Sequence, residues 1–197
     1  MLTKKQQLIK RVFDLLFSFL GILVLTLPIL ILAFFSFLST NKNGFFNQER
    51  IGQNGKVFSI FKLRSMVAND SKNHITLKND KRITKFGKFL RKYNLDELPQ
   101  IYNVFFGSMS FVGPRPDVKG YADVLQGDDT IILTVKPGIT GPATLKFKHE
   151  AELLAAQKNP LKYNDEVLWK QKITINKNYI KNWSLLNDIK YIIKTIL

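Results

Sequence analysis

The sequence predicts an α/β protein, mostly helical, that is held at one face of a membrane by its N-terminal segment. Three observations indicate this class: a long apolar run near the N-terminus, alternation typical of a short β-hairpin, and helical periodicity in three later segments. We expect a membrane helix with a basic flank in residues 1–40 and a globular domain in residues 41–197.

The composition restricts the partner and the chemistry. The formal charge of +15 predicts an anionic partner, and nucleic acid, acidic lipid and a phosphorylated substrate all satisfy it. The chain contains no cysteine, which excludes disulfides and thiol chemistry and fits a reducing compartment or a bacterial cytoplasmic face.

The apolar run predicts a membrane segment. No side chain from Leu15 to Asn41 is ionisable, and residues 15–38 are about long enough to cross a hydrocarbon core. A cleaved signal peptide is the alternative, but the run is longer than a signal-peptide core and no small-residue cleavage site follows it.

The topology of this segment follows from its flanks and its proline. Basic residues on both sides indicate that both ends are cytoplasmic, and Pro28 predicts a kink near the middle. A re-entrant helix that bends and returns to the same leaflet accounts for both features. A plain single span with a tolerated proline is the open alternative. The basic flanks are Lys4, Lys5, Lys10 and Arg11 before the run, and Lys42, Arg50, Lys56, Lys62 and Arg64 after it.

After a linker in residues 41–46, alternating residues around an Asn-Gly turn predict a β-hairpin in residues 50–66. The polar stretch 69–82 is expected to be a surface loop, with His74 in solvent because no second ligand stands at metal spacing. Residues 83–93 predict an amphipathic helix whose basic face could lie on lipid.

A second helix is predicted to start just ahead of Pro99, with Asn94 as its cap and Glu97 reaching back in a capping box. Asp96 and Glu97 would then be helix-start acids favoured by the helix dipole. The alternative is chemical: near Arg91, one carboxylate could attack phosphorus while the other holds a divalent cation.

Two stretches rich in glycine and proline, residues 107–117 and 135–146, predict shaped loops rather than strands. Arg115 lies between two prolines, and the stiff backbone would suit a guanidinium that binds phosphate in a fixed geometry. The alternative is a proline-stiffened turn with an exposed arginine and no ligand. Residues 182–197 predict an interfacial amphipathic helix, with burial against the domain as the alternative.

Together, "LDELPQ", "SFVGPRP" and "PGITG" closely resemble the bacterial sugar transferase family, the small monotopic phosphoglycosyl transferases. The resemblance covers almost the whole chain. It implies a re-entrant helix at the cytoplasmic face of the bacterial inner membrane. It also implies transfer of a sugar 1-phosphate from a UDP-sugar to undecaprenyl phosphate with release of UMP, as the first membrane step of glycoconjugate synthesis.

The resemblance also implies roles for particular residues. Asp96 would be the nucleophile that forms a phosphosugar-aspartyl intermediate, and Glu97, together with Asp96, would bind Mg²⁺. The implied phosphate-binding positions are Lys62, Arg91, Arg115 and the loop-shaping Pro116, and the implied kink is at Pro28.

The expected partners are a UDP-sugar, a polyprenyl phosphate and membrane lipids, with no nucleic acid and with a homodimer left open. One alternative is a single-span anchored protein without activity, whose basic domain binds acidic lipid or nucleic acid. Another is a partner subunit that keeps the fold without the chemistry. The intact pair Asp96 and Glu97 favours the enzyme over both.

The chain departs from the family pattern in three places. Thr26-Leu27-Pro28 stands where a Ser-Pro pair is usual, and residues 142–155 differ from the usual stretch, so the donor sugar is not predicted. Asn176 stands where an acid is frequent. Either Asp165 or Glu166 replaces that acid or its role is absent.

Overall fold

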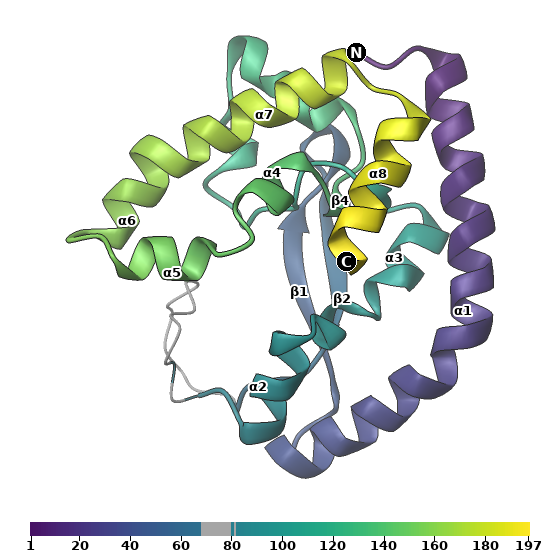
Figure 1. Ribbon diagram of the computed structural model, residues 1–197, viewed down its shortest axis with the longest axis vertical. Helices are drawn as coiled ribbons and strands as arrows, with labels where there is room; N and C mark the ends of the chain where they lie inside the picture. Colours follow the sequence, from purple (N-terminus) through teal and green to yellow (C-terminus); the bar gives the residue numbers. More distant parts are fainter. Residues whose placement is uncertain (68–79, 81) are drawn as a thin grey trace.

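The computed structural model describes residues 1–67, 80 and 82–197. It is mostly helical, as predicted, with a two-stranded antiparallel sheet beneath α7 (Figure 1). His74 and most of the predicted loop 69–82 lie outside the described residues. The helices and strands are α1 (Lys4–Thr40), β1 (Phe45–Ile51), β2 (Val57–Leu63), α2 (Lys85–Lys92), α3 (Gln100–Phe106), β3 (Ser110–Val112), β4 (Gly138–Thr140), α4 (Pro142–Lys146), α5 (Glu150–Ala155), α6 (Pro160–Tyr163), α7 (Trp169–Lys181) and α8 (Leu185–Ile196).

The helix α1 runs along one edge of the molecule, bends near its middle and then passes beneath α2 (Figure 1). The bend agrees with the predicted kink, since Pro28 has no N–H for the helical hydrogen bond. Among the described residues, α1 is the one helix whose length and composition would allow it to cross a membrane.

The packing of α1 is the reverse of that of a soluble helix. Its outer face exposes large apolar side chains, such as Leu23, Val24 and Leu27. Most of its buried residues are polar, namely Lys10, Asp14, Ser18, Ser36 and Thr40, beside Ile29 and Ala33. Exposed apolar area of this extent would be unfavourable in water, so the outer face of α1 suits lipid.

The predicted hairpin is confirmed. β1 and β2 pair antiparallel from Phe45 opposite Leu63 to Ile51 opposite Val57. A 3₁₀ turn over Gln53–Gly55 joins them, with Asn54 and Gly55 at positive φ as an Asn-Gly turn requires. The predicted linker is too long at its end, because Phe45 and Phe46 already belong to β1.

The prediction that residues 107–117 and 135–146 are loops without strands is wrong in part. β3 and β4 form a short parallel pair, with Ser110 opposite Gly138 and Val112 opposite Thr140. Glycine is needed here for close approach rather than for a turn. A methyl group on Gly138 would lie 2.1 Å from the Gly113 nitrogen, so a side chain there would separate the strands.

A hydrophobic cluster joins α1 to the helices around the acid pair. Ile29 and Ala33 of α1 pack with Leu63, Leu90 and Ile101 from β2, α2 and α3. The predicted amphipathic helix is confirmed as α2, in which Leu90 is fully buried. On the outer side of α2, Phe89 and Tyr93 are exposed.

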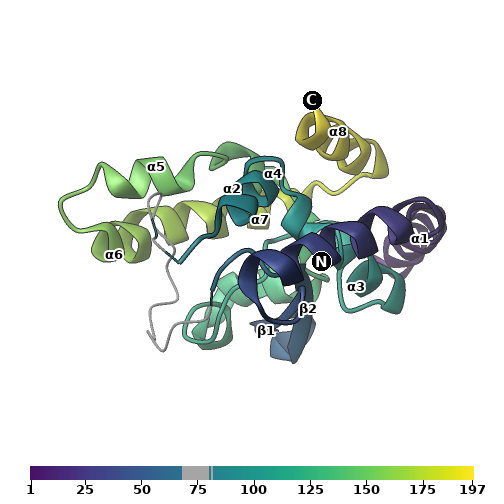
Figure 2. The ribbon, with the colours of Figure 1, turned by 90° about the horizontal axis from the view of Figure 1, so that it is seen from below.

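The C-terminal helices lie at several places around the molecule. α7 crosses one end, α8 lies beside α1, and α5 and α6 lie on the side away from α1 in both views (Figures 1 and 2). The C-terminal segment is buried against the domain in part: Trp183 and Asp188 are buried, whereas Leu186, Ile193 and Ile196 are exposed. Its placement at a membrane interface stays a prediction.

Candidate active site

The acid pair lies on a separate turn between α2 and α3. Leu95–Glu97 forms a 3₁₀ turn, and α3 begins only at Gln100. The predicted capping box is wrong, because Asn94 adopts the left-handed conformation with φ 53° and its side chain makes no capping hydrogen bond. The side chain of Glu97 therefore does not reach back along its own helix and extends to other segments instead.

Glu97 is the centre of an ion cluster that includes Lys62 of β2 and Arg115 of the loop after β3. Lys62 Nζ donates to Glu97 Oε1 at 3.0 Å. Arg115 binds the carboxylate with both guanidinium nitrogens, Nη1 to Oε2 at 3.2 Å and Nη2 to Oε1. Burial alone would raise the pKa of Glu97, but Arg115 and then Lys62 outweigh it and hold the pKa well below its usual range. Glu97 is therefore ionised at any physiological pH.

Arg115 is both ion-paired and accessible to solvent. Its side chain remains 46% exposed, although it is ion-paired with Glu97. The carboxylate of Glu97 raises the pKa of Arg115 further above its already high value. An exposed guanidinium on a stiff Pro-Arg-Pro backbone can bind an incoming anion in a fixed geometry.

Asp96 differs from its neighbour. It is 9% exposed, and among the described residues no other side chain forms a hydrogen bond or ion pair with its carboxylate. Burial, followed by the charge of Glu97, raises the pKa of Asp96, while Lys62 and Arg91 oppose the rise. The environment thus pushes the pKa values of two adjacent carboxylates in opposite directions, a pattern typical of sites in which two acids have different roles.

Arg91 of α2 lies close enough to Asp96 to influence its pKa but is held by other partners. Its Nε donates to Ser65 Oγ at 2.8 Å, and its Nη2 lies 3.0 Å from Met66 Sδ. The structure therefore gathers the predicted residues around the acid pair, with Lys62 and Arg115 in contact with Glu97 and Arg91 beside Asp96.

Sequence reasoning missed two residues of this region. Arg50 is predicted only as a flanking charge, yet its Nη1 donates to the Pro116 carbonyl at 3.4 Å, and its buried Nε has no hydrogen-bond partner among the described residues. Asp117 follows the Pro-Arg-Pro motif, and burial raises its pKa to about 6 despite the nearby Lys172, Arg50 and Arg115. Its position next to the motif was the available signal.

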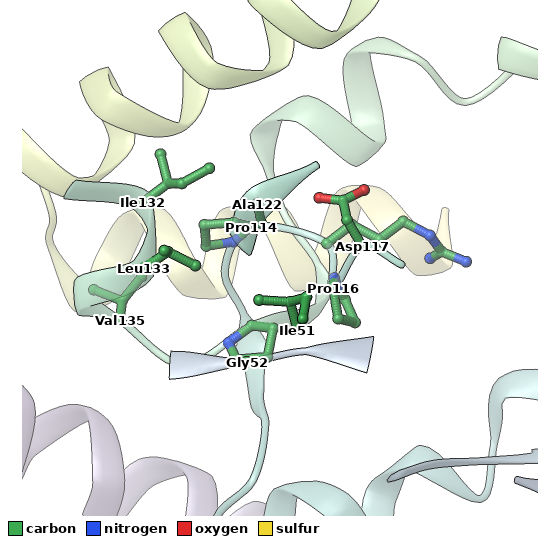
Figure 3. A pocket seen from close by; sticks show the side chains of 11 residues that line it. Ile51, Gly52, Pro114, Pro116, Asp117, Ala122, Ile132, Leu133 and Val135 are labelled. Atoms are coloured by element: carbon green, nitrogen blue, oxygen red, sulfur yellow. The ribbon is translucent and has the colours of Figure 1, made fainter. Parts of the chain in front are cut away.

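A small hollow lies beside the motif. Pro114 lies between Ile132 and Val135 on one side and Asp117 on the other, and Pro116 lies below Asp117, next to Ile51 (Figure 3). Arg115 also lines the hollow, whereas Asp96 and Glu97 do not. The hollow is therefore adjacent to the acid pair rather than centred on it.

The structure also locates the departures from the family pattern. Thr26 Oγ1 bonds to the Ile22 carbonyl at 2.6 Å and to the Tyr102 hydroxyl at 2.9 Å, which ties the bend of α1 to α3. Asn176 is buried in α7. Asp165 accepts a hydrogen bond from Tyr121 at 2.8 Å on a π-helical turn that precedes α7, and its replacement of an acid at position 176 stays a prediction. Glu166 lies on the same turn.

Only a few of the described side chains near the acid pair could bind Mg²⁺. Among the described residues, no group of three or more acidic, histidine or cysteine side chains could hold a metal ion. Mg²⁺ in phosphoryl-transfer sites is, however, commonly bound by one or two carboxylates together with substrate phosphates. The free carboxylate of Asp96 beside that of Glu97 fits this limited ligand set.

Comparison with known proteins agrees with the motifs. The family model described as "Bacterial sugar transferase" matches residues 5–197. The chain is 40% identical over 195 residues to a UDP-glucose:undecaprenyl-phosphate glucose-1-phosphate transferase of Klebsiella pneumoniae, covering 95% of this chain and 39% of the relative. It is 31% identical over 209 residues to an undecaprenyl-phosphate galactose phosphotransferase of Salmonella typhimurium, covering 98% and 40%.

A relative of similar length also matches. The uncharacterized sugar transferase EpsL of Bacillus subtilis is 32% identical over 190 residues, which are 96% of this chain and 86% of the relative. The chain thus spans most of EpsL, but it covers only 39% and 40% of the Klebsiella and Salmonella relatives.

Proposed function

Because the chain belongs to the bacterial sugar transferase family, we propose that it transfers a sugar 1-phosphate from a UDP-sugar to undecaprenyl phosphate and releases UMP. The names of the Klebsiella and Salmonella relatives support this donor and acceptor class. The reaction would be the first membrane step in the synthesis of a capsule, exopolysaccharide or other glycoconjugate.

The observation that carries this proposal is the Asp96 carboxylate inside a cationic site, where no side chain of residues 1–67, 80 and 82–197 is bonded to it. Asp96 attacks the sugar-bearing phosphorus of the donor, and a P–O bond forms as the bond to UMP breaks. UMP leaves, and the enzyme keeps a phosphosugar-aspartyl intermediate. An oxygen of undecaprenyl phosphate then attacks the same phosphorus, which releases the Asp96 carboxylate and yields the polyprenyl diphosphate sugar.

The surrounding cations make the approach of one anion to another feasible. A diphosphate repels a carboxylate nucleophile unless positive charge offsets both. Arg115 is exposed and can bind donor phosphate oxygens, while Lys62 holds Glu97 in place. Arg91, held by Ser65, is close enough to Asp96 for its charge to lower the pKa of that carboxyl.

We propose that Asp96 and Glu97 also hold Mg²⁺ together with the donor phosphates. The ion would neutralise charge on the diphosphate and on the departing UMP. Glu97 suits this role because it stays ionised, and Arg115 can exchange the Glu97 carboxylate for a donor phosphate. A homodimer stays a prediction that a single chain does not test.

The membrane topology belongs to the same proposal. Near the start of α1, Lys10 Nζ bonds to Asp188 Oδ2 at 2.5 Å, and near its end, Ser36 Oγ donates to the Arg64 carbonyl. Both ends of α1 are therefore held by one globular domain. A helix that crossed the bilayer would have to give up one of these contacts, which supports a re-entrant helix at the cytoplasmic face of the inner membrane.

This topology can be tested with single cysteines, since the chain has none of its own. Lys5→Cys and Lys42→Cys place the label at exposed positions on either side of the helix. Lys42 is preferred to the nearby Gly44, because a Cβ at position 44 would lie 1.9 Å from the Ala33 carbonyl oxygen. In intact spheroplasts, a membrane-impermeant maleimide should label neither variant, and it should label both after lysis. Labelling of one variant from outside would show a single span.

The reaction is tested by incubating the purified protein with Mg²⁺, undecaprenyl phosphate and a panel of UDP-sugars, with UMP as the readout. Without acceptor, a donor labelled at the sugar-bearing phosphate should leave label on the protein. UMP release without retained label would support transfer but contradict the covalent intermediate. No UMP from any donor in the panel, with folded protein, would contradict the proposed reaction for those sugars.

A further inference from the structure

A second cationic site lies at the start of α1, away from the acid pair. An open cavity of about 350 Å³ is lined by the first turns of α1, Gln53, Ser110 of β3 and residues 134–136, which precede β4. The proposed chemistry does not use this cavity. In Figure 1 the start of α1 lies toward the opposite end of the molecule from α2, which leads into the turn bearing Asp96.

Two positive charges converge on this cavity. A methyl group built on Gly107 would lie 3.2 Å from Arg11 Nη2 and also 3.2 Å from Lys136 Nζ, so both groups approach one point. The φ of Gly107 is 88°, a conformation that disfavours any side chain, so this space stays free. Arg11 donates to the carbonyls of Val104 and Phe105, which fix its guanidinium without neutralising it.

The acids near the cavity already have partners. Asp14 accepts hydrogen bonds from Ser110 Oγ and from the Phe111 nitrogen, both at 3.1 Å. Asp188, behind Lys10, is bound by that lysine at 2.5 Å. In the part of the chain that the structure describes, Lys136 makes no hydrogen bond or ion pair. Burial and then Arg11 lower its pKa, while the charge of Asp14, which also lines the cavity, opposes them. An anion placed here would relieve the repulsion between Arg11 and Lys136.

An apolar stripe leads away from the cavity along the outer face of α1. Leu8 lines the cavity and is 64% exposed. Val12 and Leu16 follow at four-residue spacing and are 55% and 54% exposed. A ligand that fits both features has an anionic head and a hydrocarbon tail.

We propose that this cavity binds the phosphate of an anionic phospholipid, with Arg11 and Lys136 on the headgroup and the acyl chains along Leu8, Val12 and Leu16. The site would fix the depth of α1 in the leaflet. The inference requires only that the outer face of α1 contacts lipid, and it is independent of the transfer reaction.

The position of the cavity distinguishes this lipid from the polyprenyl phosphate acceptor. The acid-bearing turn packs through Leu95 and Leu98 against the cluster of Ile29 and Ala33. Ile29 and Ala33 lie about 20 positions beyond Lys10 in α1, which corresponds to roughly 30 Å along the helix. An acceptor phosphate must reach Asp96, and Asp96 does not line the cavity.

The test counts lipids bound to the detergent-purified full chain by native mass spectrometry during titration with phosphatidylglycerol or phosphatidylcholine. The wild type should bind one phosphatidylglycerol molecule tightly and should bind phosphatidylcholine with clearly lower affinity. Lys136→Gln should weaken that binding roughly tenfold, because a charge-assisted phosphate contact is lost. Lys136→Arg should retain it. Lys119→Gln is the matched control, since Lys119 is exposed and its Nζ lies 3.8 Å from Glu49 Oε2 elsewhere on the surface.

Three results would overturn the proposal. One is equal binding of both lipids by the wild type, and another is unchanged phosphatidylglycerol affinity in Lys136→Gln. The third is displacement of phosphatidylglycerol by lower concentrations of undecaprenyl phosphate, which would make the cavity an acceptor site. None of these measurements depends on turnover, so failure of the lipid site and failure of the proposed reaction are separable.

Discussion

Two clusters in this molecule each pair a carboxylate with a lysine, and they differ in what they leave free. In the first, Asp188 accepts hydrogen bonds from Lys10 at 2.5 Å, Tyr179 at 2.8 Å and Trp183 at 3.0 Å. Asp188 is 1% exposed. In the second, Glu97 binds Lys62 and Arg115, but Arg115 is half-exposed, and no side chain in the described part of the chain is bonded to the adjacent Asp96.

The difference separates a structural cluster from a functional one. A buried ionic network in which every group is satisfied fixes the geometry of the elements that it joins, here α1, α7 and α8. A cluster with a free carboxylate and an exposed guanidinium still has groups available to bind substrate. The same chemical substitution should therefore have opposite consequences in the two places.

The largest expected effect is on activity in the second cluster. Asp96→Asn should lower UMP release by at least about a thousandfold, because an amide does not attack phosphorus. Its thermal unfolding midpoint in the same detergent should stay close to that of the wild type, since no side-chain partner is lost. Full activity in this variant would leave Asp96 as a turn residue only.

The same substitution in the first cluster should act on stability. Asp188→Asn leaves Lys10 as a buried charge without its counter-ion and should destabilise the protein by about 3 to 5 kcal/mol. Thermal unfolding measures the loss, and the rate per folded molecule should remain near that of the wild type. An unchanged unfolding midpoint would show that the network is not a structural clamp.

A smaller effect is expected for Arg115→Lys. An ammonium cannot bind phosphate with two parallel hydrogen bonds, so turnover should fall roughly 10- to 100-fold while the protein stays folded. Arg64→Lys is the matched control, because Arg64 lies at the end of the hairpin and bonds to the carbonyl of Asn43 at 2.7 Å. Near-normal turnover in Arg115→Lys would reduce the Pro-Arg-Pro loop to a stiff turn.

The smallest effect concerns Asp117, whose pKa is raised from 3.8 to about 6, mainly by burial. Because the folded-state pKa lies above the unfolded one, the contribution to stability is complete below about pH 4 and is lost as pH rises through 6. One pKa unit corresponds to about 1.4 kcal/mol, and partial exposure reduces it, so we expect about 1 to 2 kcal/mol. Urea unfolding between pH 4 and 7 should show this loss in the wild type and not in Asp117→Asn. A parallel loss in both proteins would exclude Asp117 as its source.

Local pattern predicted the elements whose signals lie within a few residues. The Asn-Gly turn located the hairpin, and the periodicity of residues 83–93 located α2. The strands β3 and β4 escaped notice because each has three residues next to glycine and proline, and they pair across more than 20 residues of chain. The capping box failed because Asn94 takes a left-handed conformation at the end of α2, which the preceding helix imposes.

The sequence by itself determined the long apolar segment, the acid pair and the family, because apolar length and short motifs are properties of the chain. The tertiary structure decided which carboxylate is held and which is free. Glu97 meets Lys62 and Arg115, which lie 35 and 18 residues away, whereas Asp96, one position earlier, does not. Packing also turned the polar side chains of α1 inward. Such partnerships depend on how distant segments meet, and a large desolvation cost makes each buried charge depend on the partner that packing supplies.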